Sequence, residues 1–257
     1  MSLSTRSQFF YGFTITSANN ALDFSEGGPE LQATLNIGDY SLEEILVEIK
    51  RAMEAAGALT YTVSVVRSTR VITISAGSTF QLLAATGTRV GTGVWSLIGF
   101  SAIDRTGAST YASQNAAGSV FRPQAIVDEH IATESWKGKS QATVAESADG
   151  TVQVATFGDV AYVQMNIWLQ TNNVIPSTQP EIEQDLSGVA NLRTFMDYAV
   201  TKAKMEFMPD RNAPNTFNKV ILDKTPASRD GIEYRLEEMR GCPGYFSTGK
   251  LVFRVVP

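Results

Sequence analysis

The sequence predicts an α+β, β-rich fold in which two regions of antiparallel strands each pack with one amphipathic helix. Three observations support this prediction. Two stretches repeat their apolar residues at the three- and four-residue steps of a helix. Shorter stretches alternate apolar and polar residues with the two-residue period of a strand. Clusters of Gly, Asn, Asp and Pro separate these stretches, as turns require.

The first helix is expected at residues 42–56. Ser41 and Glu44 have the spacing of a capping box, in which each side chain accepts the backbone N–H of the other residue. Gly57 stands where a left-handed residue would end the helix. The apolar face is expected to comprise Leu42, Ile45, Leu46, Ile49, Met53 and Ala56. The other faces are expected to present Glu43, Glu48, Lys50, Arg51 and Glu54.

A hairpin is expected at 60–75, with a short turn at 67–70. Apolar and polar residues alternate on both sides of that turn. Further strands in this half are expected at 9–16, 21–24 and 31–37. The aromatic stretch 95–100 can be read as a ligand pocket, but we interpret it as core closure, because aromatic residues at this density mostly serve packing.

Composition predicts two domains, an N-terminal α+β module at 1–115 and a C-terminal β-rich domain at 116–257. Small polar residues between 106 and 118 are typical of a linker. The second domain is expected to contain a helix at about 187–207, broken by Pro209. Its strands are expected at 142–146, 152–155, 161–169, 218–222, 234–236 and 250–255, the first two joined through Asp-Gly as a hairpin.

The overall charge and the cysteine count exclude several classes of partner and site. A net charge of −5 gives no general attraction to nucleic acid or to anionic membranes. Cys242 is the single cysteine, so no disulfide forms within the chain. The sequence contains no run of eighteen apolar residues, so we expect no membrane insertion and a chain that folds as a soluble protein.

No pattern of residues indicates catalysis, a metal site or a cofactor site. His130 is the single histidine, and neither an HExxH arrangement nor a GxSxG elbow accompanies it. Residues 91–93 have glycines but lack the lysine of a P-loop. Three carboxylate pairs have the residue types of a glycosidase, but we interpret them as helix-start or solvated groups: Glu43 with Glu44, Glu181 with Glu183, and Glu237 with Glu238. We therefore expect a protein that is not an enzyme.

Short structural motifs run through about residues 10–112. They are NNALDF at 19–24, EGG at 26–28, LQATL at 31–35, GDYS at 38–41, the helix, YTVS at 61–64, STFQLL at 78–83 and SLIGF at 96–100. As a set they resemble a module found in virion tail proteins of tailed bacteriophages. In the C-terminal half, 207–211 and 244–251 are similar to tail-associated proteins as well.

The resemblance implies a structural component of a phage tail, a minor tail protein of the tail tip or baseplate. Such a protein is synthesised in the host cytoplasm and located in the virion. Its implied partners are other copies of itself and other phage tail proteins. The family pattern has no catalytic residues to transfer. Because symmetric interfaces bury aromatic anchors, we expect Trp136, Trp168 and Tyr245 to serve at such an interface.

Two alternative functions are weighed against this one. A module that binds a glycan or receptor on the host surface predicts exposed aromatic residues beside Asn and Asp in loops, for which 172–173 and 212–215 are candidates. An enzyme that degrades the cell wall predicts a carboxylate pair in a cleft, for which Glu181 and Glu183 are candidates.

Overall fold

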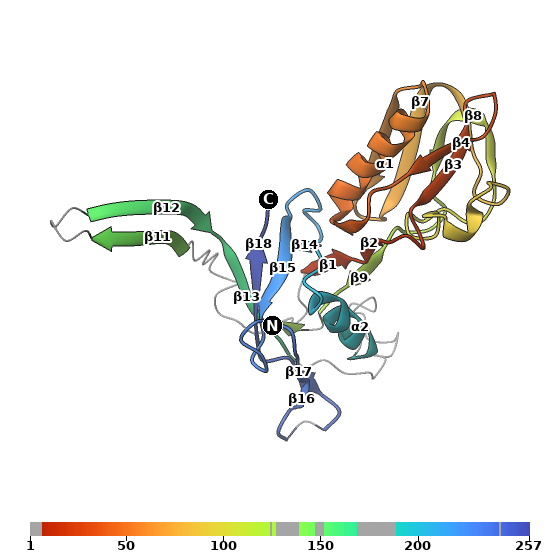
Figure 1. Ribbon diagram of the computed structural model, residues 1–257. Helices are drawn as coiled ribbons and strands as arrows, with labels where there is room; N and C mark the ends of the chain where they lie inside the picture. Colours follow the sequence, from red (N-terminus) through yellow and green to blue (C-terminus); the bar gives the residue numbers. More distant parts are fainter. Residues whose placement is uncertain (1–6, 124, 127–138, 147–151, 169–188, 242) are drawn as a thin grey trace. The chain divides into compact units, whose positions relative to one another are not determined.

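A computed structural model describes residues 7–123, 125–126, 139–146, 152–168, 189–241 and 243–257 (Figure 1). The chain divides into two compact units. The N-terminal unit comprises the described residues up to Phe121 together with Ala203–Phe217, and the C-terminal unit comprises Arg122–Lys202 and Asn218–Pro257. The division at 115 and 116 stays a prediction. The units differ from it mainly because Ala203–Phe217 belongs with the N-terminal residues.

The main sheet of the N-terminal unit has the strand order β4-β3-β7-β6, and β8 also pairs with β7. Its strands are β3 (Ala21–Ser25), β4 (Leu31–Thr34), β6 (Tyr61–Val66), β7 (Val71–Leu82) and β8 (Arg105–Ala112). Helix α1 (Leu42–Ala56) packs on this sheet in contact with β4 and β6 (Figure 1). All of these pairings are antiparallel, so the predicted α+β, β-rich class is confirmed.

Four short strands and one later strand complete the N-terminal unit. They are β1 (Gln8–Tyr11), β2 (Phe13–Ile15), β5 (Gly38–Tyr40), β9 (Ser119–Phe121) and β14 (Met205–Met208). Strand β1 pairs with both β9 and β14, and β2 pairs with β5. The strand expected at 9–16 is interrupted at Gly12, where φ is +93°, so β1 and β2 can join different partners.

Helix α1 begins and ends where the sequence predicts. The capping box is present: Glu44 N–H donates to Ser41 Oγ at 3.2 Å, and Ser41 N–H donates to Glu44 Oε2 at 3.0 Å. Glu48 is not part of the predicted apolar face, yet it is only 7% exposed. Its carboxylate accepts Asn36 N–H at 2.5 Å and pairs with Arg51 at 2.6 Å, which satisfies the buried charge.

The expected left-handed conformation of Gly57 is also wrong. Its φ of −113° and ψ of −174° are extended. Glycine is needed there because a Cβ atom would lie 2.2 Å from Oε1 of Glu26. That carboxylate accepts Ala58 N–H at 2.9 Å, Leu59 N–H at 3.0 Å and the Tyr61 hydroxyl at 2.9 Å. Glu26 therefore closes the loop that follows α1.

The predicted hairpin at 60–75 is confirmed by the pairing of β6 with β7. Arg70 N–H donates to Val66 O at 2.7 Å to close the turn, and Arg70 has a φ of 58°. Strand β7 continues past the predicted end to Leu82, where it also pairs with β3 and β8. The hairpin is therefore part of the main sheet, in which β7 is paired with β3, β6 and β8.

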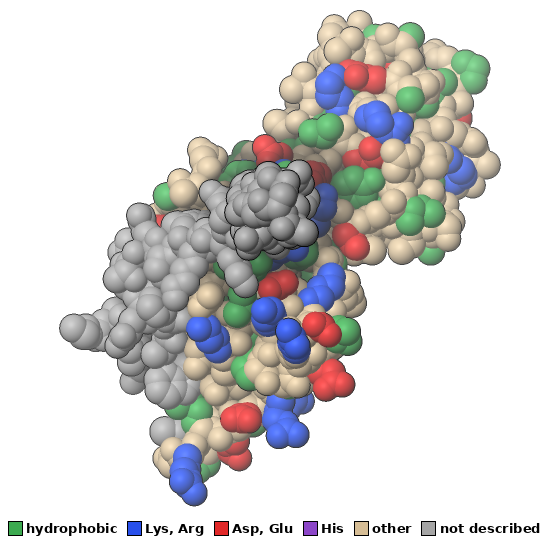
Figure 2. Space-filling model, turned by 60° about the vertical axis from the view of Figure 1, so that its left-hand side comes forward, with side chains coloured by type: hydrophobic (Ala, Val, Ile, Leu, Met, Phe, Trp, Pro, Cys, Tyr) green, Lys and Arg blue, Asp and Glu red, His purple; other side chains and the backbone are tan. Residues whose placement is uncertain are grey.

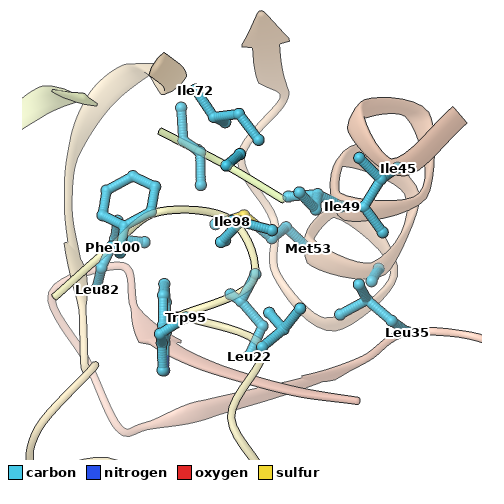
Figure 3. Close-up of a cluster of buried hydrophobic side chains, with 14 of the residues drawn as sticks. Leu22, Leu35, Ile45, Ile49, Met53, Ile72, Leu82, Trp95, Ile98 and Phe100 are labelled. Atoms are coloured by element: carbon cyan, nitrogen blue, oxygen red, sulfur yellow. The ribbon is translucent and has the colours of Figure 1, made fainter. Parts of the chain in front are cut away.

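The core of the N-terminal unit lies between α1 and the main sheet. Figure 3 shows Trp95, Ile98 and Phe100 directed into the same cluster as Ile49 and Met53 of α1. Trp95 and Phe100 are 4% and 2% exposed and meet edge to face at 6.0 Å between ring centroids. This burial confirms the interpretation of 95–100 as core closure.

Buried Asp23 holds the loop that leads into this cluster. The side chain is 2% exposed and accepts Arg89 N–H at 2.6 Å and Arg89 Nε at 2.9 Å. The same guanidinium donates to Ala33 O at 2.7 Å and to Thr34 Oγ1 at 2.9 Å. Residues 91–93 follow directly and include a 3₁₀ turn, η1 (Val90–Thr92). The bidentate pair thus fixes the loop against β3 and β4.

The sheet of the C-terminal unit contains β10 (Ala125–Ile126), β13 (Tyr162–Trp168), β18 (Lys250–Val255) and β15 (Asn218–Lys224), in that spatial order. Two further pairs form sheets of their own: β11 (Lys139–Glu146) with β12 (Val152–Val160), and β16 (Glu237–Glu238) with β17 (Phe246–Ser247). The β11–β12 pair confirms the predicted hairpin. The strand predicted at 234–236 is wrong, because strand structure begins only at Glu237.

Helix α2 (Val189–Ala199) is shorter than the predicted helix at 187–207. Residues 187–188 lie outside the described residues, and the predicted C-terminal extension is wrong. Lys202 has a φ of 64°, and its ammonium group donates to Leu222 O at 2.8 Å and to Asp223 O at 2.9 Å. These bonds help to end the helical path, and Met205–Met208 then forms strand β14. Within the described residues, neither α-helix has the length and apolar character needed to cross a membrane.

We expect Gly57→Ala to lower the free energy of unfolding by about 1–3 kcal/mol, because the new Cβ must displace the Glu26 carboxylate. Urea denaturation followed by circular dichroism measures this change. In a Glu26→Ala background the same substitution should cost clearly less, since the extended backbone at Gly57 admits alanine. Equal costs in both backgrounds would contradict the proposed close approach.

Candidate interaction surface

The structure describes two of the three residues that are expected at an interface. Trp136 lies outside the described residues. Trp168 is the last residue of β13, and its Cα is paired with that of Ala125. Tyr245 is half-buried and precedes β17. Thr248 N–H donates to Ile167 O at 3.0 Å, so the segment after Tyr245 lies beside the end of β13. Their role at an interface stays a prediction.

In the described part of the chain, the candidate catalytic residues do not come together in one site. Several lie outside that part: His130, Cys242, Glu181, Glu183 and 172–173. Glu43 and Glu44 are in the first turn of α1, as expected for helix-start residues. Glu237 and Glu238 are exposed in β16, and Glu238 accepts Gly244 N–H at 2.7 Å. Among the described residues, no three His, Cys, Asp or Glu side chains are grouped to hold a metal ion.

The segment Ala203–Phe217 is bound to the N-terminal unit by a buried ion pair. Glu206 in β14 is 0% exposed, and its carboxylate pairs with Arg67, which has a side chain 10% exposed. Glu206 Oε1 also accepts Glu43 N–H at 2.8 Å, in the first turn of α1. The positive end of the helix macrodipole stabilises a carboxylate at this position. The site therefore joins β14, α1 and the β6–β7 turn.

Two further contacts strengthen this attachment. The Arg67 guanidinium lies 3.7 Å from the ring centroid of Phe217, at the other end of the segment. Lys204 pairs with Glu44 at 2.9 Å. Burial raises the pKa of the Glu206 carboxyl, and Arg67 and Glu43 N–H oppose that rise. The sequence predicts a helix as far as residue 207, and the local pattern of this segment does not reveal the ion pair.

The β11–β12 hairpin differs from the other long strands because it belongs to a separate two-stranded sheet. Val144 is paired with Val154, and Glu146 with Val152, in a register that shifts once between Ser140 and Ala142. In the part of the chain that the structure describes, neither strand pairs with a third (Figure 1). Isolated two-stranded hairpins are at best marginally stable in water. Pairing with a further strand would stabilise this one.

The composition of the hairpin favours such pairing. The charged residues of the two strands, Lys139, Glu146 and Asp159, are at or next to strand ends, and residues 140–145 and 152–158 contain no charged residue and no proline. Charged residues and prolines are the usual means by which edge strands avoid pairing with another chain. β12 has nine residues, which corresponds to a strand of about 30 Å. The hairpin thus offers two long edges on which a strand of another chain could add.

The distribution of charge on the surface is mixed. On the face shown in Figure 2, Lys and Arg side chains are interspersed with Asp and Glu over the described residues. With the net charge of −5, this face gives no continuous basic surface of the kind that binds phosphate backbones. The charge distribution thus marks no binding surface, and the uncovered edges of the β11–β12 hairpin are the candidate surface for a protein partner.

No protein-family model matches the chain, and no curated protein is significantly similar to it.

We expect Arg67→Met to destabilise the protein by about 3–5 kcal/mol at neutral pH, because it leaves the Glu206 carboxylate buried and unpaired. The folded-state pKa of Glu206 is raised, so the folded protein takes up a proton more readily than the unfolded chain as the pH falls. The difference in the free energy of unfolding between the wild type and the variant should therefore become smaller below neutral pH. Urea denaturation at several pH values measures it.

The double variant Arg67→Met with Glu206→Gln is the control. The double variant has no charge at this position. Its loss of unfolding free energy relative to the wild type should therefore not become smaller as the pH falls, in contrast to the single variant. A single variant whose loss of unfolding free energy stays constant or grows as the pH falls would contradict the assignment of Glu206 as the responsible group.

Proposed function

We propose that the chain is a non-enzymatic structural component of a bacteriophage tail, at the tail tip or baseplate. It assembles with other copies of itself and with other tail proteins. The protein is made in the host cytoplasm and located in the virion. The motifs between residues 10 and 112 support the tail assignment, and the free edges of the β11–β12 hairpin support assembly through strand pairing.

The β11–β12 hairpin is the observation that supports assembly through strand pairing. A single free edge would favour a two-fold dimer, in which the same edge of each copy pairs with its counterpart. Here β11 and β12 both have an outer edge that no described strand covers. In a head-to-tail arrangement, β11 of one copy pairs with β12 of the next, and repetition of that contact closes a ring when the rotation permits. A symmetric ring uses both edges.

In this proposal the N-terminal unit is a body that is stable by itself, and the pairing element belongs to the other unit. The core and the buried ion pairs of the N-terminal unit are complete within one chain. The hairpin, by contrast, is a sheet of two strands, and such a sheet is at best marginally stable by itself in water. A stable domain combined with a less stable pairing element is typical of subunits that are joined to their neighbours by strand addition.

Light scattering of the purified full chain over a concentration series tests the proposal. We expect a discrete oligomer whose population grows with concentration. Val144→Lys in β11 and Ala155→Lys in β12 should each shift the equilibrium towards the monomer by roughly tenfold or more, because lysine in an edge strand disfavours the addition of another strand.

Val47→Lys is the matched control for these variants. Val47 is 65% exposed on α1, so a lysine there should leave both folding and assembly unchanged. A wild-type protein that stays monomeric at every concentration would contradict self-assembly through the hairpin. An oligomer that is insensitive to both hairpin variants would assign assembly to a different surface.

A further inference from the structure

A hollow of about 400 Å³ lies in the C-terminal unit, between the segment 226–237 and residues 248–249. This volume is within the range of small-molecule sites. Pro226 and Ala227 are the apolar part of the lining, and most of the other lining residues are polar or charged. None of these residues belongs to the hairpin, so the hollow is independent of the assembly proposed above.

Hydrogen bonds to the sheet of the C-terminal unit fix one part of the lining. Thr248 is 4% exposed, and its Oγ1 accepts Ile167 N–H at 3.2 Å and donates to Gly249 O at 2.9 Å. Gly249 has a φ of +64°, and a Cβ atom there would lie 2.7 Å from Cγ of Pro226. Glycine therefore allows Pro226 to approach this part of the lining, and the shape of the hollow is built into the fold.

Tyr234 forms a fixed aromatic part of the lining. Its hydroxyl donates to Asp197 Oδ1 of α2 at 2.6 Å. Burial and this hydrogen bond raise the pKa of Tyr234 to about 12, so the phenol is neutral at physiological pH. Thr225 Oγ1 donates to Glu233 O, which holds the start of the same segment. The aromatic ring is thus positioned by α2 before any ligand arrives.

Three charged side chains in the lining are free to meet a ligand. Glu233, Arg235 and Glu237 occupy alternate positions of one extended segment, and all three are exposed. None of their side chains makes a hydrogen bond or ion pair with the described residues. Two carboxylates, which only accept hydrogen bonds, therefore stand on either side of a guanidinium, which only donates them.

This alternation of acceptor, donor and acceptor suits a ligand that offers both donors and acceptors at close spacing. An anion would meet two carboxylates, and a simple cation would meet the guanidinium. The adjacent hydroxyl groups of a sugar ring donate and accept, and the apolar face of the ring can lie against Tyr234 or Pro226. We infer that this hollow is a carbohydrate-binding site.

Saturation-transfer NMR on the full chain tests the site, with glucose, galactose, rhamnose and N-acetylglucosamine each offered in turn. We expect at least one of these sugars to receive saturation from the protein. Arg235→Ala should weaken its binding about tenfold to a hundredfold, the effect of losing hydrogen bonds from a charged donor. Ala227→Trp, which fills the hollow from an exposed part of its lining, should abolish the signal.

Arg229→Ala is the matched control, because Arg229 is exposed in the same unit and does not line the hollow. It should bind as the wild type does. The inference is overturned if none of the four sugars receives saturation, or if binding survives both Arg235→Ala and Ala227→Trp in folded protein. It is also overturned if putrescine receives saturation while none of the four sugars does and Ala227→Trp removes the putrescine signal, which would indicate a cation site. Neither result affects the oligomer measured by light scattering.

Discussion

The carboxylate of Glu206 is fully buried, and the N-terminal unit depends on the groups that neutralise it. Arg67 approaches from the β6–β7 turn, and Glu43 N–H approaches from the first turn of α1. A buried carboxylate without such partners would be strongly destabilising. The helix, the hairpin turn and β14 must therefore all be in place at once, which makes the attachment of Ala203–Phe217 part of the folding of this unit rather than a later addition.

The parts of the fold that the sequence predicts are those with local signals. The Ser41–Glu44 capping box and the helical apolar repeat define α1 from residues close in the chain. Alternation defines β6 and the first part of β7, and an Asp-Gly turn identifies the β11–β12 hairpin. The aromatic density at 95–100 identifies core. In each case the residues that determine the structure are neighbours in sequence.

The parts that the sequence does not predict depend on distant partners. Met205–Met208 is a strand because β1, about two hundred residues earlier, pairs with it. Glu48 is buried because Asn36 and Arg51 satisfy it, and Gly57 is glycine because Glu26 lies against it. The hollow also depends on residues distant in the sequence. Glu233, Arg235 and Glu237 alternate along one segment, but only the fold brings them together with Pro226 and Gly249 in one lining.

The path of the chain has a mechanical consequence. Among the described residues, the polypeptide passes from one unit to the other after Phe121, after Lys202 and after Phe217, so at least three covalent connections join the two units. A force that separates them is shared among these backbone segments, and a single proteolytic cut leaves the units connected. Strand β14, between the last two crossings, is held by its buried ion pair and resists being drawn out. In the tail component proposed above, this connectivity would keep the two units joined under load.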